Sequence, residues 1–407
     1  MPFIEPDFER QMIDYGLTVE DLGPRLDPGT TAAAQLDLGL PWPPGLAPQP
    51  KAIIPEPDRD TPLPHADVLV VTWTVAEVEA LADVLTPGVG RNSWYRYANK
   101  FESDYVSANK IRKGAPALAA KRLGSYYLTE IAGKKLLLFK SELHLNQDGI
   151  RTAPGKATLP VADLFRQIIK EVNPSLVITV GTAGATFPPT GETAIDGQNW
   201  QPHALGDVMI TRGAKFRLSQ EFANEAFAHT GYTSNHNLPT SRLAQAATLL
   251  DMHAAKLTEP GFGPPTTKYA WPQGGLVKGH PNKPKLRLDG EDFPAFHPIL
   301  TTDSFEFGTS TNDLQLQGCG VEMGDAVLGM VVQELRDAGK LAPNWLVIRN
   351  ASDPQINGGL PDGQLTDIDP RMRRALNMQA HWAVWYYEVY GYWTSVNSAI
   401  GVWAMVA

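Results

Sequence analysis

Short runs of apolar residues alternate with amphipathic stretches along most of the chain after residue 65. The run at 66–73 (ADVLVVTW) is rich in β-branched residues and predicts a strand that is buried on both faces. Thr74 is placed to cap the amphipathic helix expected at 75–85, and Pro87 and Gly88 stop that helix. The pattern here is therefore a strand followed directly by a helix.

The same alternation continues to the C-terminus. A hairpin is expected around Gly133, and a helix at about 157–172 leads into a strand at 174–185 that ends in a glycine-rich turn. Further strands are expected at 204–216, 297–305, 318–323 and 344–353, with helices at about 239–257, between the last two strands, and from near Pro370. Strands that alternate with helices predict an α/β fold: a single three-layer domain with a central mixed, mostly parallel sheet flanked by helices.

Proline and glycine mark the segments that fall outside this alternation. Residues 1–65 are a proline-rich N-terminal extension, and residues 66–407 form the α/β domain. Two segments within that domain, near 91–124 and 258–296, are predicted to be insertions. The chain is long for one domain, and these added segments account for the excess.

Composition narrows the class of protein. Lys and Arg total 35 against 44 Asp and Glu, a net charge of −9 that argues against a nucleic-acid-binding surface. Cys319 is the only cysteine, which excludes an internal disulfide framework, and the nine histidines show no metal-binding spacing. We therefore expect neither a cofactor nor a metal.

The two ends of the chain bear on location. The N-terminus carries acids and no apolar run of signal-peptide length. Residues 389–407 carry no charge, but they contain Asn397, and no Lys or Arg flank follows them. A buried C-terminal helix or a subunit-interface segment is therefore a better interpretation than a membrane span. We expect a cytoplasmic protein with no membrane contact.

Polar and small residues follow the predicted strands, where open α/β sheets bind their ligands. The candidates are Glu77 after the first strand, Thr182, Ala183 and Gly184 after the strand at 174–185, Asp303 and Phe305, then Glu322, Met323 and Asp325, and finally Asn350, Ser352 and Asp353. Carboxylates thus converge from at least three strand ends. A pair of carboxylates in an apolar pocket can supply one general acid and one general base.

Six motifs at these strand ends carry a resemblance. In order over about 66–390 they are VLVVTWTVAEVEAL, LVITVGTAGA, GDVMIT, TTDSF, VEMGDAV and VIRNASD. The set resembles the nucleoside phosphorylase/nucleosidase superfamily, which includes purine nucleoside and uridine phosphorylases and methylthioadenosine/S-adenosylhomocysteine nucleosidases. It is closest in motif to the nucleosidase branch. The resemblance implies a nucleoside phosphorylase-like fold and cleavage of an N-glycosidic bond.

The resemblance also implies roles for individual residues. Asp353 matches the acid that protonates N7 of a purine, with Ser352 orienting it, and Glu77 matches the acid that activates the attacking water. Phe305 matches the aromatic that stacks on the base, and Met323 the methionine packed under the ribose. Glu322 precedes that methionine as in the family. Each residue has a plainer alternative: a strand-end cap for Asp353, a helix-dipole acid for Glu77, and core packing for the other two.

Two departures from the family pattern limit the prediction. Gly324 stands where the family carries a second glutamate that binds the ribose 2′- and 3′-hydroxyls, so either Asp325 replaces it or the sugar is held differently. The phosphate-binding arginines of the phosphorylase branch are not evident, and nothing in their spacing assigns Arg91, Arg96 or Arg151 to that task.

These observations favour a hydrolase that releases free base and ribose from a purine nucleoside. A phosphate-dependent phosphorylase and a non-catalytic nucleoside-binding or sensing protein are the alternatives. The expected partner is a small nucleoside, and the resemblance implies a homo-oligomer.

Overall fold

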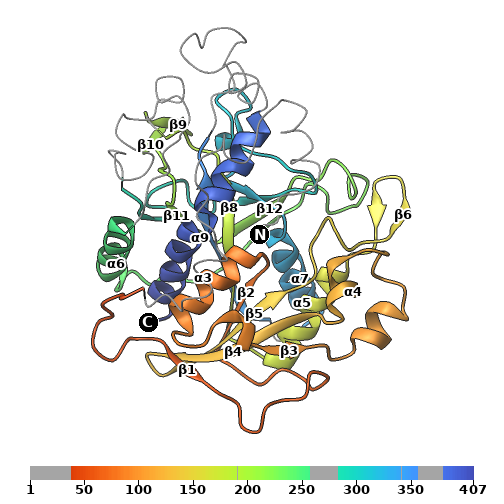
Figure 1. Ribbon diagram of the computed structural model, residues 1–407. Coiled ribbons are helices and arrows are strands. Elements are labelled where there is room, and N and C mark those ends of the chain that lie inside the picture. The colour runs from red at the N-terminus through yellow and green to blue at the C-terminus, as the bar shows by residue number, and fades with distance from the viewer. Residues whose placement is uncertain (1–37, 190, 257–282, 341, 356–378) are drawn as a thin grey trace, which may run out of the picture.

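The computed structural model describes residues 38–189, 191–256, 283–340, 342–355 and 379–407. In this part of the chain, helices lie on both sides of a central β-sheet (Figure 1). The α/β fold class with a mixed, mostly parallel central sheet is thereby confirmed. Most of the N-terminal extension, most of the second predicted insertion and the beginning of the last predicted helix lie outside the described residues.

The centre of the sheet consists of parallel strands. β2 (Val68–Thr72) lies between β5 (Lys134–Ser141) and β8 (Leu176–Ala185) and runs parallel to both. β17 (Asn344–Asp353) pairs with the other edge of β8, also in parallel. All residues of β2 are buried, as its run of β-branched residues predicts. The carboxyl ends of β2, β8 and β17 therefore meet at one edge.

Other strands extend the sheet in both directions. The order is β1-β4-β5-β2-β8-β16-β15-β12-β13, with β3 paired to β4, β11 paired to β17, and β14 paired to β11. Their bounds are β1 Gln49–Lys51, β3 Tyr95–Tyr97, β4 Gly124–Ile131, β11 Val208–Thr211, β12 Gly213–Phe216, β13 Gly231–Thr233, β14 Leu286–Leu288, β15 Ile299–Thr301 and β16 Gly320–Glu322. Two small ladders stand apart: β6 (Arg151–Ala153) with β7 (Lys156–Ala157), and β9 (Thr193–Ile195) with β10 (Gln198–Trp200).

The single strand predicted at 204–216 is wrong in one respect. The chain forms two strands, β11 and β12, and each pairs with different neighbours on either side of Arg212. Asp289 holds this break, because its carboxylate accepts hydrogen bonds from the Arg212 backbone N–H at 2.7 Å and from the guanidinium Nη2 at 2.7 Å. A continuous apolar run does not reveal a change of partner at one residue.

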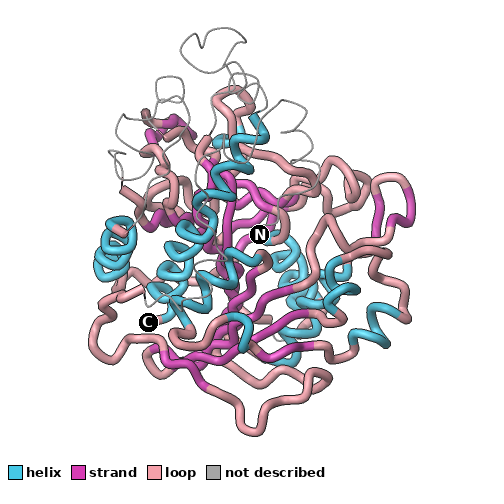
Figure 2. Tube along the Cα trace, viewed as in Figure 1, coloured by secondary structure: helices cyan, strands magenta, loops and turns pink. Residues whose placement is uncertain are grey.

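Two pairs of helices form the outer layers. α3 (Val75–Leu85) packs with α9 (Gln379–Val406), which also contacts β8 and β17, and α5 (Pro160–Val172) packs with α7 (Asp325–Asp337). Figure 2 shows the helices on both sides of the strands. α4 (Pro116–Ala120) is a single short turn, and α6 (Leu243–Ala255) packs on α9. Three single turns also occur: 3-10 helices at Arg91–Ser93 and Leu314–Leu316 and a π-helix at Phe101–Val106.

The C-terminal helix is buried from Tyr390 onward, as expected. Trp403 is fully enclosed; its ring lies 5.2 Å from that of Trp42, and its Nε1 donates to the Leu46 carbonyl at 2.7 Å. The described part of the proline-rich N-terminal extension therefore packs on the last helix of the same chain. Among the described helices, none is long and apolar enough to cross a membrane.

Candidate active site

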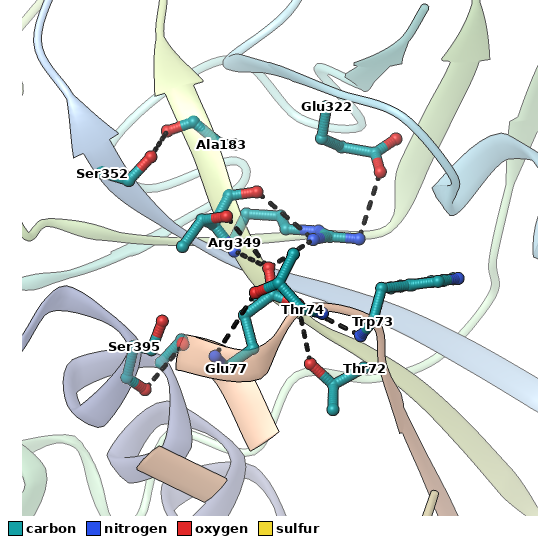
Figure 3. Close-up of polar contacts among 12 residues, drawn as sticks. Thr72, Trp73, Thr74, Glu77, Ala183, Glu322, Arg349, Ser352 and Ser395 are labelled. Carbon is teal, nitrogen blue, oxygen red and sulfur yellow. Dashed lines mark hydrogen bonds and ion pairs between the residues drawn. The ribbon is translucent and has the colours of Figure 1, made fainter. Parts of the chain in front are cut away.

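Glu77 occupies the first turn of α3, where its backbone and side chain form a capping box with Thr74. The carboxylate lies at the edge where β2 and β8 end. Its Oε2 accepts hydrogen bonds from Thr72 Oγ1 at 3.0 Å, from the Trp73 N–H at 3.1 Å and from the Thr74 N–H at 2.8 Å. Its Oε1 accepts from the Thr182 N–H at 2.8 Å and from Thr182 Oγ1 at 2.9 Å. Five donors thus fix this carboxylate (Figure 3).

Those contacts decide the ionisation of Glu77. Burial alone would raise its pKa, but the positive charge of Arg349 and the backbone N–H groups of Thr74, Thr182 and Trp73 outweigh burial. The pKa is lowered as a result. Glu77 is therefore an ionised carboxylate at neutral pH, held in one orientation at the carboxyl edge of the sheet.

Arg349, in the middle of β17, connects the carboxylates of this edge. Its Nε and Nη2 donate to the two oxygens of Asp325 at 2.8 and 2.6 Å, a bidentate pair. Nη2 also donates to Glu322 Oε2 at 3.1 Å, and Nη1 donates to the Thr182 carbonyl at 3.2 Å and lies 3.7 Å from Glu77 Oε1. One buried guanidinium thus faces three buried carboxylates.

The excess of negative charge around Arg349 affects the pKa of Glu322. Burial and the nearby charge of Asp325 raise its pKa to about 7, although Arg349 acts in the opposite direction. Its Oε1 accepts a hydrogen bond from Thr301 Oγ1 and another from the Asp325 N–H at 2.9 Å, so it also satisfies the beginning of α7. β16 runs antiparallel to β8 from Gly320 opposite Ala185, which brings Glu322 back towards Arg349.

Asp353, at the end of β17, has a different environment. Ser352 Oγ donates to its Oδ1 at 3.0 Å, and Oδ2 has no hydrogen-bond partner among the residues that the structure describes. Burial raises the pKa of Asp353 to about 7, with the Ser352 hydrogen bond acting against it. The carboxyl group is therefore partly protonated at neutral pH, as a general acid must be.

The glycines of the GTAGA motif make room for these carboxyl groups. A Cβ at Gly181 would lie 2.3 Å from Glu77 Oε1, and one at Gly184 would lie 2.9 Å from Asp353 Oδ2. The sequence predicted a turn at this segment. That prediction is wrong, because β8 continues through the segment to Ala185. Its register with β17 shifts between Ala351 and Asp353, a bulge that changes the direction of the last side chains.

The remaining candidates lie in varied settings. Phe305 is 53% exposed beside Phe307, and Met323 is 37% exposed and accepts a contact from Asn146 Nδ2 at 3.3 Å. The Asp303 carboxylate accepts backbone hydrogen bonds from Ser219, Gln220 and Phe222 and holds that loop. Asp325 is committed to Arg349, and Ala183 accepts a hydrogen bond from Ser352 through its carbonyl.

The structure adds two residues that the sequence reasoning did not single out, Arg349 and Trp73. Arg349 interrupts the apolar run of β17, and a buried arginine requires buried acceptors, so the strand pattern contained a signal. From the sequence, Trp73 was identified only as the last residue of a predicted strand. Its ring lies against Arg349, with the guanidinium carbon 5.1 Å from the ring centroid. In the described part of the chain, no group of three His, Cys, Asp or Glu residues is arranged to hold a metal.

No protein-family model matches the sequence, and no curated protein sequence matches it. The structure is similar to a methylthioadenosine/S-adenosylhomocysteine nucleosidase from Neisseria meningitidis in complex with methylthio-immucillin-A, with 16% identity, a TM-score of 0.40, and coverage of 84% of this chain and 98% of that chain.

Two further solved structures are similar to this chain. One is futalosine hydrolase of Helicobacter pylori, at 10% identity and a TM-score of 0.39 over 83% of this chain and 96% of that chain. The other is a methylthioadenosine nucleosidase from Arabidopsis thaliana, at 14% identity and a TM-score of 0.38 over 83% of this chain and 97% of that chain.

Proposed function

We propose that this protein hydrolyses the N-glycosidic bond of a purine nucleoside and releases the free base and the sugar. The observation that carries the proposal is Asp353, a buried carboxyl group with a pKa near 7 and one oxygen without a partner among the described residues. It lies at the same edge of the sheet as the ionised Glu77. Two carboxyl groups held in opposite protonation states are what acid-assisted departure and water attack require.

Asp353 acts on the leaving base in this scheme. Breaking the bond to C1′ leaves electron density on the purine, and a proton delivered to N7 lets the base depart as a neutral molecule. A carboxyl group that is partly protonated at neutral pH can deliver that proton, a contribution of typically ~10²–10⁴-fold in rate. Ser352 holds the other oxygen of Asp353 through its hydroxyl.

Glu77 acts on the opposite face of the sugar. As the bond to the base breaks, positive charge develops on the sugar ring, and a fixed carboxylate stabilises that charge. Glu77 then accepts a proton of the attacking water as the bond to C1′ forms. Its lowered pKa keeps Glu77 ionised at neutral pH but makes it a weak base. A weak base is sufficient when the water attacks a sugar that already carries positive charge.

The arginine contacts favour water over phosphate as the nucleophile. Arg349, the arginine at this edge of the sheet, is already paired with Asp325 and Glu322, and Arg91 is paired with Glu79 at 2.7 Å. A phosphate dianion needs cations that are not neutralised in this way. Hydrolysis is therefore the better proposal, and phosphorolysis is an outcome that its test must distinguish.

The test is incubation with a panel of purine nucleosides, with and without phosphate, followed by chromatography of the products. We expect free base and free sugar at a rate that does not depend on phosphate. Formation of a sugar 1-phosphate only when phosphate is present would establish a phosphorylase instead. Saturable nucleoside binding in calorimetry with no base released over hours would establish a binding protein.

A further inference from the structure

Trp73 is enclosed at the carboxyl end of β2, next to the proposed catalytic carboxylates. The side chain is 6% exposed; Arg349 lies against its ring and Phe165 of α5 meets it edge-on at 6.2 Å. Figure 3 shows Trp73 beside Arg349, on the side towards Glu322. Its Nε1 is buried and has no hydrogen-bond partner among the described residues. A buried donor left unpaired is costly and calls for an explanation.

Gly324 and Trp73 share one space. A Cβ at Gly324 would lie 3.1 Å from Cζ2 and 3.4 Å from Cε2 of the Trp73 indole, and 3.5 Å from Glu322 Oε2. The ring therefore occupies the volume into which any side chain at position 324 would extend. The indole of Trp73 fills the space that is left because residue 324 has no side chain.

The carboxylates around this space are already committed to the protein. Both oxygens of Asp325 accept from Arg349, both oxygens of Glu322 accept hydrogen bonds, and the two oxygens of Glu77 accept five between them. A sugar bound here meets an indole in place of a free carboxylate. Removing a sugar hydroxyl thus leaves no oxygen of these three carboxylates without a hydrogen bond.

We infer that Trp73 sets the sugar specificity of this site, and that the site accepts deoxyribonucleosides almost as well as ribonucleosides. The inference rests on the proposed function. An enzyme rejects a deoxy analogue by a large factor only where the missing hydroxyl leaves buried polar groups of the site unpaired. Here a missing hydroxyl would leave the Trp73 N–H unpaired, as it already is among the described residues, so the loss is one neutral hydrogen bond, worth about tenfold.

The first measurement compares kcat/KM for adenosine, 2′-deoxyadenosine and 3′-deoxyadenosine. We expect the three values to lie within about tenfold of each other. A preference of a hundredfold or more for adenosine over either deoxy analogue would overturn the inference. Trp73→Phe keeps an aromatic ring and removes the N–H, so it should bring the three values still closer together.

Variants at position 324 test the shared space. Gly324→Ala crowds the indole and should lower kcat/KM for all three nucleosides alike, whereas the control Gly231→Ala, whose Cβ meets nothing closer than Lys215 at 3.8 Å, should change nothing. The double variant Trp73→Ala/Gly324→Glu makes room for a free carboxylate and should prefer adenosine by more than tenfold. If the double variant does not fold, the wild type and Trp73→Phe still decide the question.

A failure of the proposed function is distinguishable from a failure of this inference. If the protein cleaves none of the purine nucleosides in the panel, hydrolysis is excluded, and calorimetry with non-hydrolysable C-nucleosides with and without the 2′-hydroxyl then measures the same discrimination. Similar affinities support the role of Trp73 in a binding site. A hundredfold preference for the ribose form, or no binding of either, overturns it.

Discussion

Arg349 and Asp325 form a bidentate ion pair in which both side chains are buried, with nitrogen–oxygen distances of 2.8 and 2.6 Å. The pair links β17 to the first turn of α7. Arg349 also lies 3.1 Å from Glu322 and 3.7 Å from Glu77, so this one pair connects α7 to the other two carboxylates.

Asp325→Asn should therefore destabilise the protein strongly. The amide replaces one acceptor oxygen by a donor, so one charge-assisted hydrogen bond of the buried bidentate pair is lost, at a cost of about 1.5–3 kcal/mol of unfolding free energy. Urea unfolding measures this loss. The matched control is Asp251→Asn, because Asp251 pairs with Lys283 at 3.4 Å on the surface, where such pairs contribute about 0–1 kcal/mol. Equal losses in the two variants would contradict the assigned role of Arg349.

Asp353→Asn should separate catalysis from stability. The amide cannot donate an acidic proton, so we expect kcat to fall by roughly 10²–10⁴-fold. The folded protein should not suffer, because Asp353 Oδ2 has no partner among the described residues to lose, and the amide oxygen can still accept from Ser352. Activity and thermal unfolding of the same preparation check both halves. Full activity in this variant would refute Asp353 as the acid.

The raised pKa of Asp353 predicts the direction of two pH effects. Wild-type activity should fall as pH rises through about 7, where the acid loses its proton. Its pKa in the folded state lies above the ordinary value of 3.8, so ionisation opposes folding and stability declines between those two values as pH rises. Asp353→Asn should thus be more stable than the wild type at pH 8 and lose that advantage at pH 4. Urea unfolding at the two pH values provides the comparison.

Glu77→Gln should reduce both activity and stability. An amide nitrogen cannot accept a hydrogen bond, so at least two of the five donors that face Glu77 would lose their acceptor. Each unsatisfied buried donor costs about 1–3 kcal/mol. Urea unfolding measures the loss, and Glu291→Gln on the surface serves as the control. An unchanged unfolding free energy would mean that these hydrogen bonds do not hold the edge of the sheet.

The lowered pKa of Glu77 predicts that the folded protein loses stability at acid pH. Its contribution to stability is present above the ordinary pKa of 4.5 and is lost as pH falls through the lower folded value. The wild type should therefore lose stability faster than Glu77→Gln as pH drops below 4.5. Acid titration followed by circular dichroism compares the two proteins.

Gly181→Ala should disrupt the site through size alone. The added Cβ would lie 2.3 Å from Glu77 Oε1 and 2.5 Å from Arg349 Nη1, both of which are held by several contacts. Overpacking of this kind typically costs about 1–3 kcal/mol. Thermal unfolding of Gly181→Ala and the control Gly231→Ala gives the comparison, with loss expected only in the first.

Local patterns predicted the central elements of the fold closely. The helix expected at 75–85 has those bounds, because its capping box and its stop signal lie within a few residues of each other. The strands expected at 66–73 and 344–353 correspond to β2 and β17, whose apolar runs are buried on both faces. Each of these elements is specified by its own neighbours in the sequence.

Contacts between distant segments decided the rest. The break between β11 and β12 depends on Asp289, which lies 77 residues from Arg212 along the chain. The sequence identified Glu77, Glu322, Asp325 and Asp353 as candidates from their places after strands, and their roles stay predictions. It did not indicate that Arg349 would take up Asp325 or that Trp73 would fill the space at Gly324.

The sequence by itself determined the α/β alternation, the strand ends that carry acids, and the absence of a side chain at position 324. The tertiary structure decided the direction in which the pKa of each carboxyl group shifts. Glu77 gains five donors and a nearby arginine, whereas Asp353 gains burial and one hydroxyl. The physical reason is that a pKa depends on the solvent, charges and donors within a few ångströms of the group, and folding brings these together from segments far apart in the sequence.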